Sequence, residues 1–399
     1  MKNDNLKKYY LKSGHTKRHH TKRYHTKSHH SKNLILKYSL YILLTLSTVS
    51  LFPLTSKSQT IIVGFYNCEN LYDTIDQRNV IDEEFTPQSH KEYNRIKFQN
   101  KITHLASVIE GMGQLEAAKG IALLGVAEIE NKMVLQQLVE STLLKKYHLK
   151  YIQFDSKDAR GVDVALLYNP SFFTPYQYRP YTLTDSSHFS DYATRDILYV
   201  QGLLDKTWVH ILVNHWPSRR GGEKQSANKR QWAATVCKKI MDSIEAQDPL
   251  AKIIVMGDFN DNPDNKSVQQ LHLQNPYFDL FKKGVGSLAY RDVWNLFDQI
   301  LLNHAWENMN PGKPIQKGIH NRMGEQLKNE AEYRSVKALF DLTYYKSIIY
   351  NNWGLLEQEG RYKGYPKRTW NGDRFNNGFS DHFPAVTIFK VKSVEIAVK

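Results

Sequence analysis

An aspartate and an asparagine two positions apart, Asp258 and Asn260, follow a short apolar run at residues 253–256 and a glycine. An Asn-Pro pair, which is a common turn signal, comes next. This pattern is typical of a buried strand that ends at an exposed edge, where side chains two apart point to the same side. The carboxylate can bind a cation or accept a proton, and the amide can hold water or phosphate. Taken alone, the stretch is equally typical of an Asx-rich turn.

The stretch at Asp258 is not isolated, because four others combine an apolar run with polar side chains at its edge. Asn67 and Glu69 follow residues 61–66, Glu128 follows residues 121–127, Asn214 and His215 follow residues 209–213, and Ser380, Asp381 and His382 precede residues 385–389. Carboxylates, amides and imidazoles are the groups that bind metal ions and transfer protons.

The order of these motifs along the chain resembles that of the endonuclease/exonuclease/phosphatase superfamily. This group includes pancreatic-type deoxyribonuclease, apurinic endonucleases, sphingomyelinases and inositol polyphosphate phosphatases. No single motif is decisive, but five motifs stand in the family's order over roughly residues 60–390. The resemblance implies a hydrolase that acts on phosphoric esters.

Hydrolysis of a phosphodiester requires a means to neutralise the phosphoryl oxygens, and Mg²⁺ or Mn²⁺ suits this task with mainly oxygen ligands. The resemblance makes Glu128 the principal predicted metal ligand. Asn67 and Glu69 match the family's first motif, in which Asn-x-Asp is common; the longer arm of Glu69 leaves its direct coordination open. Asp381 is a further candidate for the metal site or for orienting water.

The resemblance also assigns catalytic roles. His382 would contact the scissile phosphate, and Asp298, in an apolar segment at residues 293–302, would orient the imidazole. A carboxylate hydrogen-bonded to an imidazole fixes its tautomer and raises its pKa, so the ring can be cationic beside phosphate. Asp258 would polarise the attacking water while Asn260 holds the phosphate. His215 resembles a second histidine that assists the leaving group in the deoxyribonuclease and sphingomyelinase-like branches.

Arg219 and Arg220 lie in a basic loop just after His215 and can present guanidinium groups to phosphate. The same sequence is also typical of a solvated turn. Residues 160–165 resemble a family strand that borders the site, which adds Arg160 and Asp163 as weaker candidates.

Lys367 and Arg368 belong to a segment, residues 361–379, in which five basic and five aromatic residues are interleaved with one aspartate. Cations among aromatic rings suit a polyanion with stackable bases. The segment ends directly before Asp381 and His382, so we expect it to border the active site. The alternative is a surface loop held in place by its own aromatic side chains.

The elements that must position these residues alternate along the chain. Helical periodicity predicts helices at residues 93–109, 132–144 and 227–246, and strands are predicted at 61–66, 151–154, 162–168, 197–204, 208–213 and before Asp258. Strands in adjacent pairs, interrupted by helices, suggest two packed sheets with helices outside. The predicted fold is an α/β four-layer sandwich, with two packed mixed β-sheets flanked by helices, as the resemblance also implies.

The first 58 residues differ from the rest in composition. Residues 1–33 are a low-complexity tract rich in Lys, Arg, His, Thr and Ser, and residues 38–56 carry no charge. A basic segment, an apolar segment and a small-x-small site before Gln59 match a secretory signal peptide, and an uncleaved membrane anchor is the alternative. We therefore divide the chain into residues 1–58, a basic tract and signal peptide, and residues 59–399, the endonuclease/exonuclease/phosphatase domain.

This division changes how the charge is interpreted. A net charge of +14 would suggest a nucleic-acid binder, but residues 1–58 hold 12 of the 54 Lys and Arg residues and only one acidic residue. The rest of the chain is close to neutral, so the overall charge does not identify the substrate.

The sequence favours an exported nuclease, periplasmic or extracellular, that hydrolyses nucleic-acid phosphodiester bonds with Mg²⁺ or Mn²⁺ by in-line attack of activated water. Nucleic acid is the expected partner, as substrate, and no stable protein partner is implied. Contact with the membrane is expected only transiently, through the signal segment. Two alternatives stay open. One is a phosphatase or phospholipase C-type hydrolase acting on lipid or inositol phosphate head groups, and the other is a non-catalytic secreted binding protein with the same fold.

Processing of the chain follows from the signal segment. We expect the mature exported protein to begin near Gln59, because the small residues that precede it suit signal cleavage. N-terminal sequencing of exported protein checks this. A protein that begins at Met1, or one held in the membrane through residues 38–56, would contradict it.

Overall fold

The computed structural model describes residues 59–183, 193–306 and 342–391. The expectations for residues 1–58, and for most of the long segment after Leu302, lie outside the described residues. The chain divides into two units, Met1–Ser56 and Lys57–Lys399, and every described residue belongs to the second. Within the described ranges no helix has the length and apolar character needed to cross a membrane.

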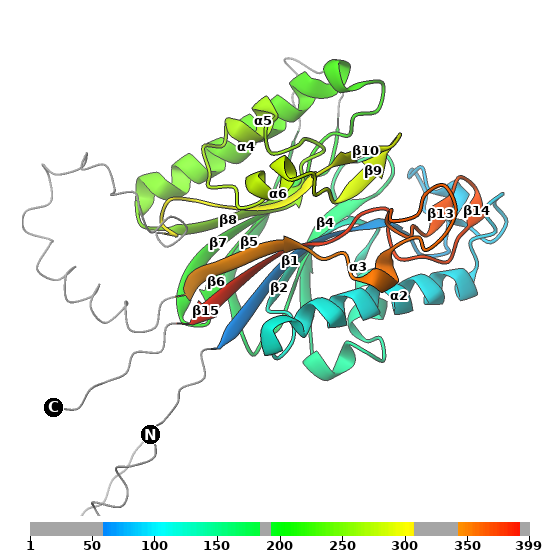
Figure 1. The fold of residues 1–399 in the computed structure, drawn as a ribbon, viewed down its shortest axis with the longest axis horizontal. Helices are drawn as coiled ribbons and strands as arrows, with labels where there is room; N and C mark the ends of the chain where they lie inside the picture. The colour runs from blue at the N-terminus through cyan, green and yellow to red at the C-terminus, as the bar shows by residue number, and fades with distance from the viewer. Residues whose placement is uncertain (1–58, 184–192, 307–341, 392–399) are drawn as a thin grey trace, which may run out of the picture. The chain divides into compact units, whose positions relative to one another are not determined.

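Two mixed β-sheets form the centre of the domain (Figure 1). The first has six strands in the order β12-β15-β1-β2-β4-β3, and the second has five in the order β11-β8-β7-β6-β5. The strands are β1 (Thr60–Leu71), β2 (Leu123–Ile129), β3 (Lys150–Gln153), β4 (Asp163–Tyr168), β5 (Phe173–Tyr181), β6 (Ile197–Leu204), β7 (Thr207–His215), β8 (Lys252–Asp258), β11 (Asp298–Leu302), β12 (Leu342–Ile349) and β15 (Ala385–Val391). Each sheet contains one parallel pair, β1–β2 and β7–β8, and these pairs carry the polar strand ends.

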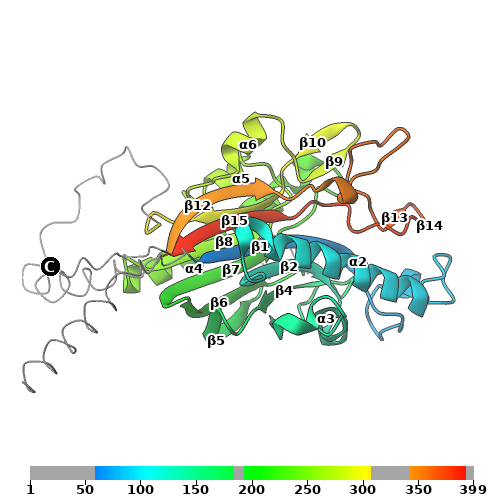
Figure 2. The same ribbon diagram turned by 60° about the horizontal axis from the view of Figure 1, so that its bottom comes forward.

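Helices cover the outer faces of both sheets, as the two views in Figures 1 and 2 show. On one side lie α2 (Arg95–Gly113) and α3 (Lys132–Val139), and on the other lie α4 (Glu223–Gln247) and α5 (Lys266–Gln269). The short α6 (Phe278–Lys282) packs Leu280 and Phe281 against the core between the sheets. The short η1 (Glu83–Phe85), η2 (Leu115–Ala117), η3 (Lys145–Tyr147) and η5 (Trp353–Leu355) are single 3₁₀ turns. Two small hairpins complete the fold, β9 (Leu288–Tyr290) with β10 (Val293–Asn295), and β13 (Trp370–Asn371) with β14 (Arg374–Phe375).

Residues 253–256 of strand β8 are all apolar because the strand is buried on both faces. Ile254 and Met256 pack in the core between the two sheets, whereas Ile253 and Val255 pack with α4 residues such as Cys237. A strand covered on both faces shows a continuous apolar run rather than alternation.

Two glycines near the site allow close packing, one between the two sheets and one between adjacent strands of the same sheet. A Cβ on Gly125 of β2 would lie 2.6 Å from the sulfur of Met256 in the opposite sheet. A Cβ on Gly257 would lie 2.4 Å from the carbonyl oxygen of Asn214 in β7. The glycine before Asp258 is therefore needed for the packing of β7 against β8, in addition to marking the end of the strand.

The predicted four-layer α/β sandwich is confirmed, and most predicted elements exist with shifted ends. The first strand continues beyond residue 66 to Leu71, and the segment at 293–302 is divided into β10 and β11. The helix predicted at 93–109 begins at Arg95, where the Asn94 side chain accepts bonds from two backbone N–H groups. Ile96, expected on its apolar face, is 71% exposed.

Strands β5 and β12 were absent from the sequence prediction. Both are edge strands, and both have mixed burial along their length. An edge strand that is only partly covered needs no continuous apolar run, so its sequence gives a weak strand signal.

Candidate active site

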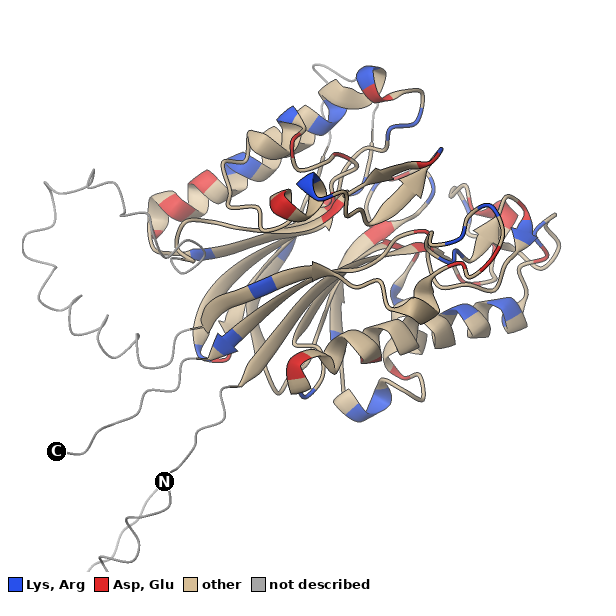
Figure 3. Cartoon of the chain, viewed as in Figure 1, with Lys and Arg blue, Asp and Glu red and all other residues tan. Residues whose placement is uncertain are grey.

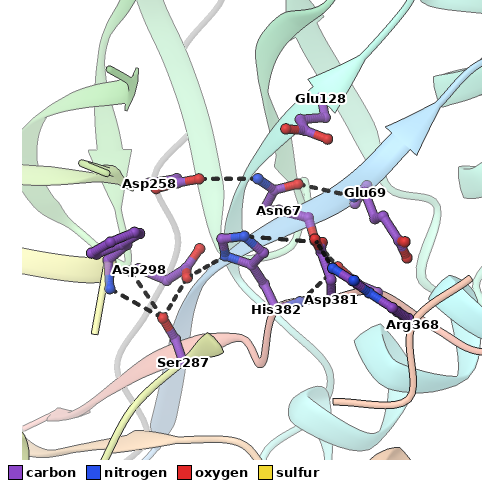
Figure 4. A network of polar contacts seen from close by, with 12 residues as sticks. Asn67, Glu69, Glu128, Asp258, Ser287, Asp298, Arg368, Asp381 and His382 are labelled. Carbon is purple, nitrogen blue, oxygen red and sulfur yellow. Dashed lines mark hydrogen bonds and ion pairs between the residues drawn. The ribbon is translucent and has the colours of Figure 1, made fainter. Parts of the chain in front are cut away.

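The ends of five strands meet between the two sheets and bring together the polar residues of the sequence motifs (Figure 4). Register places Asp258 between His215 on β7 and Asp298 on β11. Asn67 reaches Asp258 from the other sheet, with its Nδ2 donating to Asp258 Oδ2 at 3.1 Å. A site that depends on strands from both sheets exists only once the sheets have packed.

Two β-bulges turn Glu69 and Glu128 away from regular strand geometry. The ladder between β1 and β2 shifts register between Asn67 and Leu71, and that between β2 and β4 shifts at Ala127. Glu69, Asn70 and Glu128 have φ angles of 49°, 52° and 62°, a region that non-glycine residues rarely occupy. The Asn70 N–H donates to Glu128 Oε2 at 2.8 Å, which joins the two bulges. Bulges and left-handed residues of this kind concentrate at functional sites, where they aim side chains.

Asp258 and Asn260 form an Asx turn and also lie in the site, so both interpretations of this stretch apply. Asp258 Oδ1 accepts from the Asn260 N–H at 2.9 Å, and Asn260 Nδ2 donates to the Trp216 carbonyl at 3.0 Å. Burial raises the pKa of Asp258 to about 7, against the lowering effect of nearby His382. A carboxylate with a pKa near neutrality is suited to accept a proton.

His382 is held by Asp298, as the sequence motifs suggested. His382 Nδ1 and Asp298 Oδ2 are 2.6 Å apart, and Ser287 Oγ donates to the same carboxylate oxygen at 2.6 Å. Burial alone would lower the pKa of His382, but the carboxylates of Asp298, Asp381 and Asp258 together raise it well above the usual value. His382 is therefore cationic at neutral pH.

His215 has the opposite protonation state. Its Nε2 lies 3.6 Å from Asp258 Oδ2 and 3.9 Å from Glu128 Oε1. Burial, with the positive charges of Arg195, Arg160 and His382, lowers its pKa well below the usual value. The lowered pKa favours the neutral ring and makes it a weak base.

Arg195 is a contributor that the sequence motifs did not indicate. It is buried, forms an ion pair with Asp158 at 3.0 Å and donates to the Trp216 carbonyl at 2.6 Å. Ser287 was missed for the same reason, because neither residue belongs to a sequence motif.

The four predicted metal ligands fall into two groups. The Glu128 carboxylate faces Asn67, Asp258 and His215, whereas Glu69 and Asp381 are engaged by the segment at residues 361–379 (Figure 4). Glu69 accepts the backbone N–H groups of Thr369 and Trp370 at 2.6 and 3.3 Å. Burial and the charge of Asp381 raise the pKa of Glu69 to about 7.

The residues present fit a hard divalent cation. Glu128, Asp258 and Asn67 supply oxygen donors, the chemistry that Mg²⁺ and Mn²⁺ prefer. Within the described residues, the buried Asp298 Oδ1 has no hydrogen-bond partner. Asp258, Asp298 and His382 also offer ligand atoms within 4.8 Å of one another. Because His382 Nδ1 is already bonded to Asp298, the carboxylates of Glu128 and Asp258 are the groups that would hold the ion.

The basic substrate candidates have different surroundings. Arg219 is satisfied within the protein: it donates to the Asn260 carbonyl at 2.9 Å and to the carboxylates of Asp261 and Glu223 at 3.0 and 2.8 Å. Arg219 therefore stabilises the turn at Asn260. This structural role replaces the substrate-binding role predicted for Arg219 from the sequence. Arg220 is exposed on the adjoining loop.

Lys367 and Arg368, assigned as a pair, are also separated by the structure. Arg368 Nη2 contacts Asp381 Oδ2 at 2.7 Å and lines a cavity next to His382, whereas Lys367 does not line that cavity. Arg368 therefore belongs to the catalytic surroundings.

The two weaker candidates border the site without facing Asp258. Asp163 accepts from Gln153 Nε2 and the Ser156 N–H, both at 2.8 Å, and burial raises its pKa to about 6. Arg160 lies near Glu128, whose charge, with that of Asp158, raises the pKa of the guanidinium against the effect of burial.

This chain belongs to the endonuclease/exonuclease/phosphatase family, whose sequence profile matches residues 62–310 and 329–392. Members of the family are phosphoric-ester hydrolases and typically depend on divalent metal ions. A comparison with curated proteins returned no match.

Solved structures with similar folds share little sequence with the chain. A family member from Bacteroides thetaiotaomicron is 13% identical, with 84% of this chain and 99% of that chain covered and a TM-score of 0.48. The mannosyl-6-phosphatase of the same organism is 13% identical, with coverages of 82% and 99% and a TM-score of 0.46. D. rerio TDP2, complexed with a single-strand DNA product, is 13% identical, with coverages of 83% and 98% and a TM-score of 0.46.

The His382–Asp298 pair makes a prediction about pH. Asp298→Asn removes the charge that raises the pKa of His382, so the ring should lose its proton at lower pH than in the wild type. If the cationic ring acts on the phosphate, the alkaline limb of kcat/KM should move to lower pH and the neutral-pH rate should fall by about 10²-fold or more. The pH profile measures both, with a melting curve to confirm folding. An alkaline limb that does not move would contradict the assignment.

Proposed function

We propose that this protein is a divalent-metal-dependent nuclease that hydrolyses internal phosphodiester bonds of nucleic acids. The observation that carries the proposal is the convergence of two histidines on Asp258: His382, whose Nδ1 is 2.6 Å from Asp298 Oδ2, and His215, whose Nε2 lies 3.6 Å from Asp258 Oδ2. Phosphodiester hydrolysis needs a cation beside the phosphoryl oxygens and a group that accepts a proton from water. The raised pKa of His382 suits it to the first role, and Asp258, with a pKa of about 7, suits the second.

The residues of the chain divide the reaction among them. Asp258 accepts a proton from the attacking water, and the Asn260 and Asn67 amides position water and phosphate. The His382 cation, held by Asp298, meets the charge that develops on the phosphoryl oxygens. The oxygen of water forms the new bond to phosphorus while the bond to the leaving oxygen breaks. The leaving oxygen takes a proton from solvent and Asp258 returns its proton to solvent, which leaves one phosphomonoester and one hydroxyl. A bound divalent ion supplies further charge neutralisation.

His215 is less suited to the role of general acid than the sequence motif implied. A neutral imidazole carries one ring proton and holds it firmly, so a histidine with a lowered pKa is a poor donor near neutral pH. Its position between Asp258 and Glu128 suits a group that orients these carboxylates.

A nucleic-acid substrate is supported by the segment between residues 361 and 379. Lys and Arg are mixed with Asp and Glu on the loops around β13 and β14 (Figure 3), and the exposed Tyr362 accompanies the basic residues. An enzyme for lipid head groups would more naturally expose aliphatic side chains near its site. Export to the periplasm or the outside, through the signal segment, is part of the same proposal.

A substrate panel tests the proposal. Residues 59–399 with Mg²⁺ or Mn²⁺ should cleave DNA or RNA, with sphingomyelin, inositol phosphates and sugar phosphates as the competing substrates. Cleavage of a circular DNA or of an end-blocked oligonucleotide identifies internal attack. Preferential hydrolysis of an inositol or sugar phosphate, with nucleic acids untouched, would overturn it.

The metal assignment gives a separate prediction. Chelation should abolish hydrolysis, and Mg²⁺ or Mn²⁺ should restore it better than Zn²⁺ does. Glu128→Gln removes a charged ligand, so the variant should need at least about tenfold more metal for half-maximal activity. Asp242→Asn, an exposed acidic residue on α4, is the matched control. A metal titration of Glu128→Gln equal to that of the wild type would refute the assignment.

A further inference from the structure

A cavity of about 470 Å³ opens next to the catalytic residues, between the β9–β10 hairpin and the segment that follows η5. Its lining includes Asp381 and Arg368, the ion pair beside His382. Asp381 Oδ1 is 3.9 Å from His382 Nε2, so a group in the cavity is separated from the phosphate site by a single side chain. The volume falls in the range of small-ligand sites.

Aromatic rings and guanidinium groups share the walls of this cavity. Tyr290 and Tyr362 line the cavity and are 62% and 49% exposed. Arg291 lies 5.2 Å from the centre of the Tyr290 ring, and Arg361 lies 5.7 Å from that of Tyr362. Each exposed ring therefore has a cation beside it.

The walls are held rigidly against each other. Tyr365 Oη donates to Asp292 Oδ1 at 2.6 Å, which ties the loop to the tip of the hairpin across 73 positions of sequence. Asp292 also lies 3.6 Å from Arg361. In the part of the chain that the structure describes, Arg291 has no carboxylate partner, so its charge is directed to solvent or to a ligand.

The turn that presents Arg291 is strained. Tyr290 pairs with Val293, and the two residues between them, Arg291 and Asp292, have φ angles of 50° and 63°. A two-residue hairpin turn with both φ angles positive normally contains Asn and Gly, because larger side chains are unfavourable there. Strain that persists in a position facing a cavity supports a functional role for these side chains.

We propose that this cavity binds the nucleotide adjacent to the scissile phosphate in a single-stranded or frayed nucleic acid. Its base stacks on the ring of Tyr362, and the phosphate beyond it meets Arg291 and Arg361. Every base has a face for stacking, so the cavity gives a preference for unpaired strands without reading sequence. The inference rests on the proposed nuclease function. It specifies that the enzyme recognises the nucleotide next to the scissile phosphate.

Stacking is tested in the full chain with Tyr362→Ala, Tyr362→Phe as the ring-preserving variant, and Tyr176→Ala, an exposed tyrosine on β5, as the control. The Tyr362→Ala variant should lose about tenfold in kcat/KM on a single-stranded oligonucleotide. It should retain the wild-type rate on bis(p-nitrophenyl) phosphate, which has no base to bind. Tyr362→Phe and Tyr176→Ala should behave as wild type on both substrates.

The phosphate contacts are tested by salt dependence. Arg291→Ala should weaken oligonucleotide affinity and reduce the slope of log affinity against log salt by about 0.7, the value for one phosphate contact on a single strand. Equal losses on both substrates, no loss on the oligonucleotide, or an unchanged salt slope would each overturn the cavity assignment. A wild type that cleaves oligonucleotides while Tyr362→Ala is unimpaired refutes the cavity alone. A wild type that neither binds nor cleaves nucleic acid but hydrolyses sugar phosphates refutes both proposals.

Discussion

A buried hydrogen bond between Asn67 and Asp258 connects the two halves of the catalytic centre, as the His382–Asp298 pair also does. Asn67 belongs to the six-stranded sheet and Asp258 to the five-stranded sheet, and the bond between them crosses the interface at 3.1 Å. The bond can form only where the sheets approach closely, which Gly125 allows by leaving room for Met256. Ser380 donates to the Asn67 carbonyl at 2.7 Å and so attaches the segment that carries His382 to the same point. The relative positions of Asn67, Asp258 and His382 therefore depend on the packing of the two sheets.

Opposite charges alternate from the helix layer to the catalytic histidine. Lys101 of α2 is fully buried and donates to Thr369 Oγ1 at 2.7 Å, and its charge offsets part of the pKa rise of Glu69. Arg368 and Asp381 follow, and then His382 with its Asp298 partner. A buried charge without a partner is costly, so each member of this series requires its neighbours. The loop that borders the proposed nucleotide cavity is thereby coupled to the catalytic centre through Arg368.

Many features of the site could be read from local sequence because strand ends have a distinct signature. A short apolar run followed by Asp, Asn, Glu or His identified Asp258, Asn67, Glu128 and His215, and the structure brings all four together. The order of the motifs identified the family and the four-layer fold. The edge strands β5 and β12 gave no such signal, because partly exposed strands can have mixed sequences.

The sequence by itself determined which strands end in reactive side chains, since burial on both faces forces an apolar run and a polar group then marks its end. Only the tertiary structure decided what surrounds each group. Arg219 bonds to Asn260, Glu69 accepts backbone N–H groups, and Arg195 reaches His215 from a distant loop. The tertiary structure also sets the pKa values of His215 and His382, because the pKa of a buried histidine depends on the charges around it. Those charges come from residues far apart in the chain, and local sequence does not specify their distances.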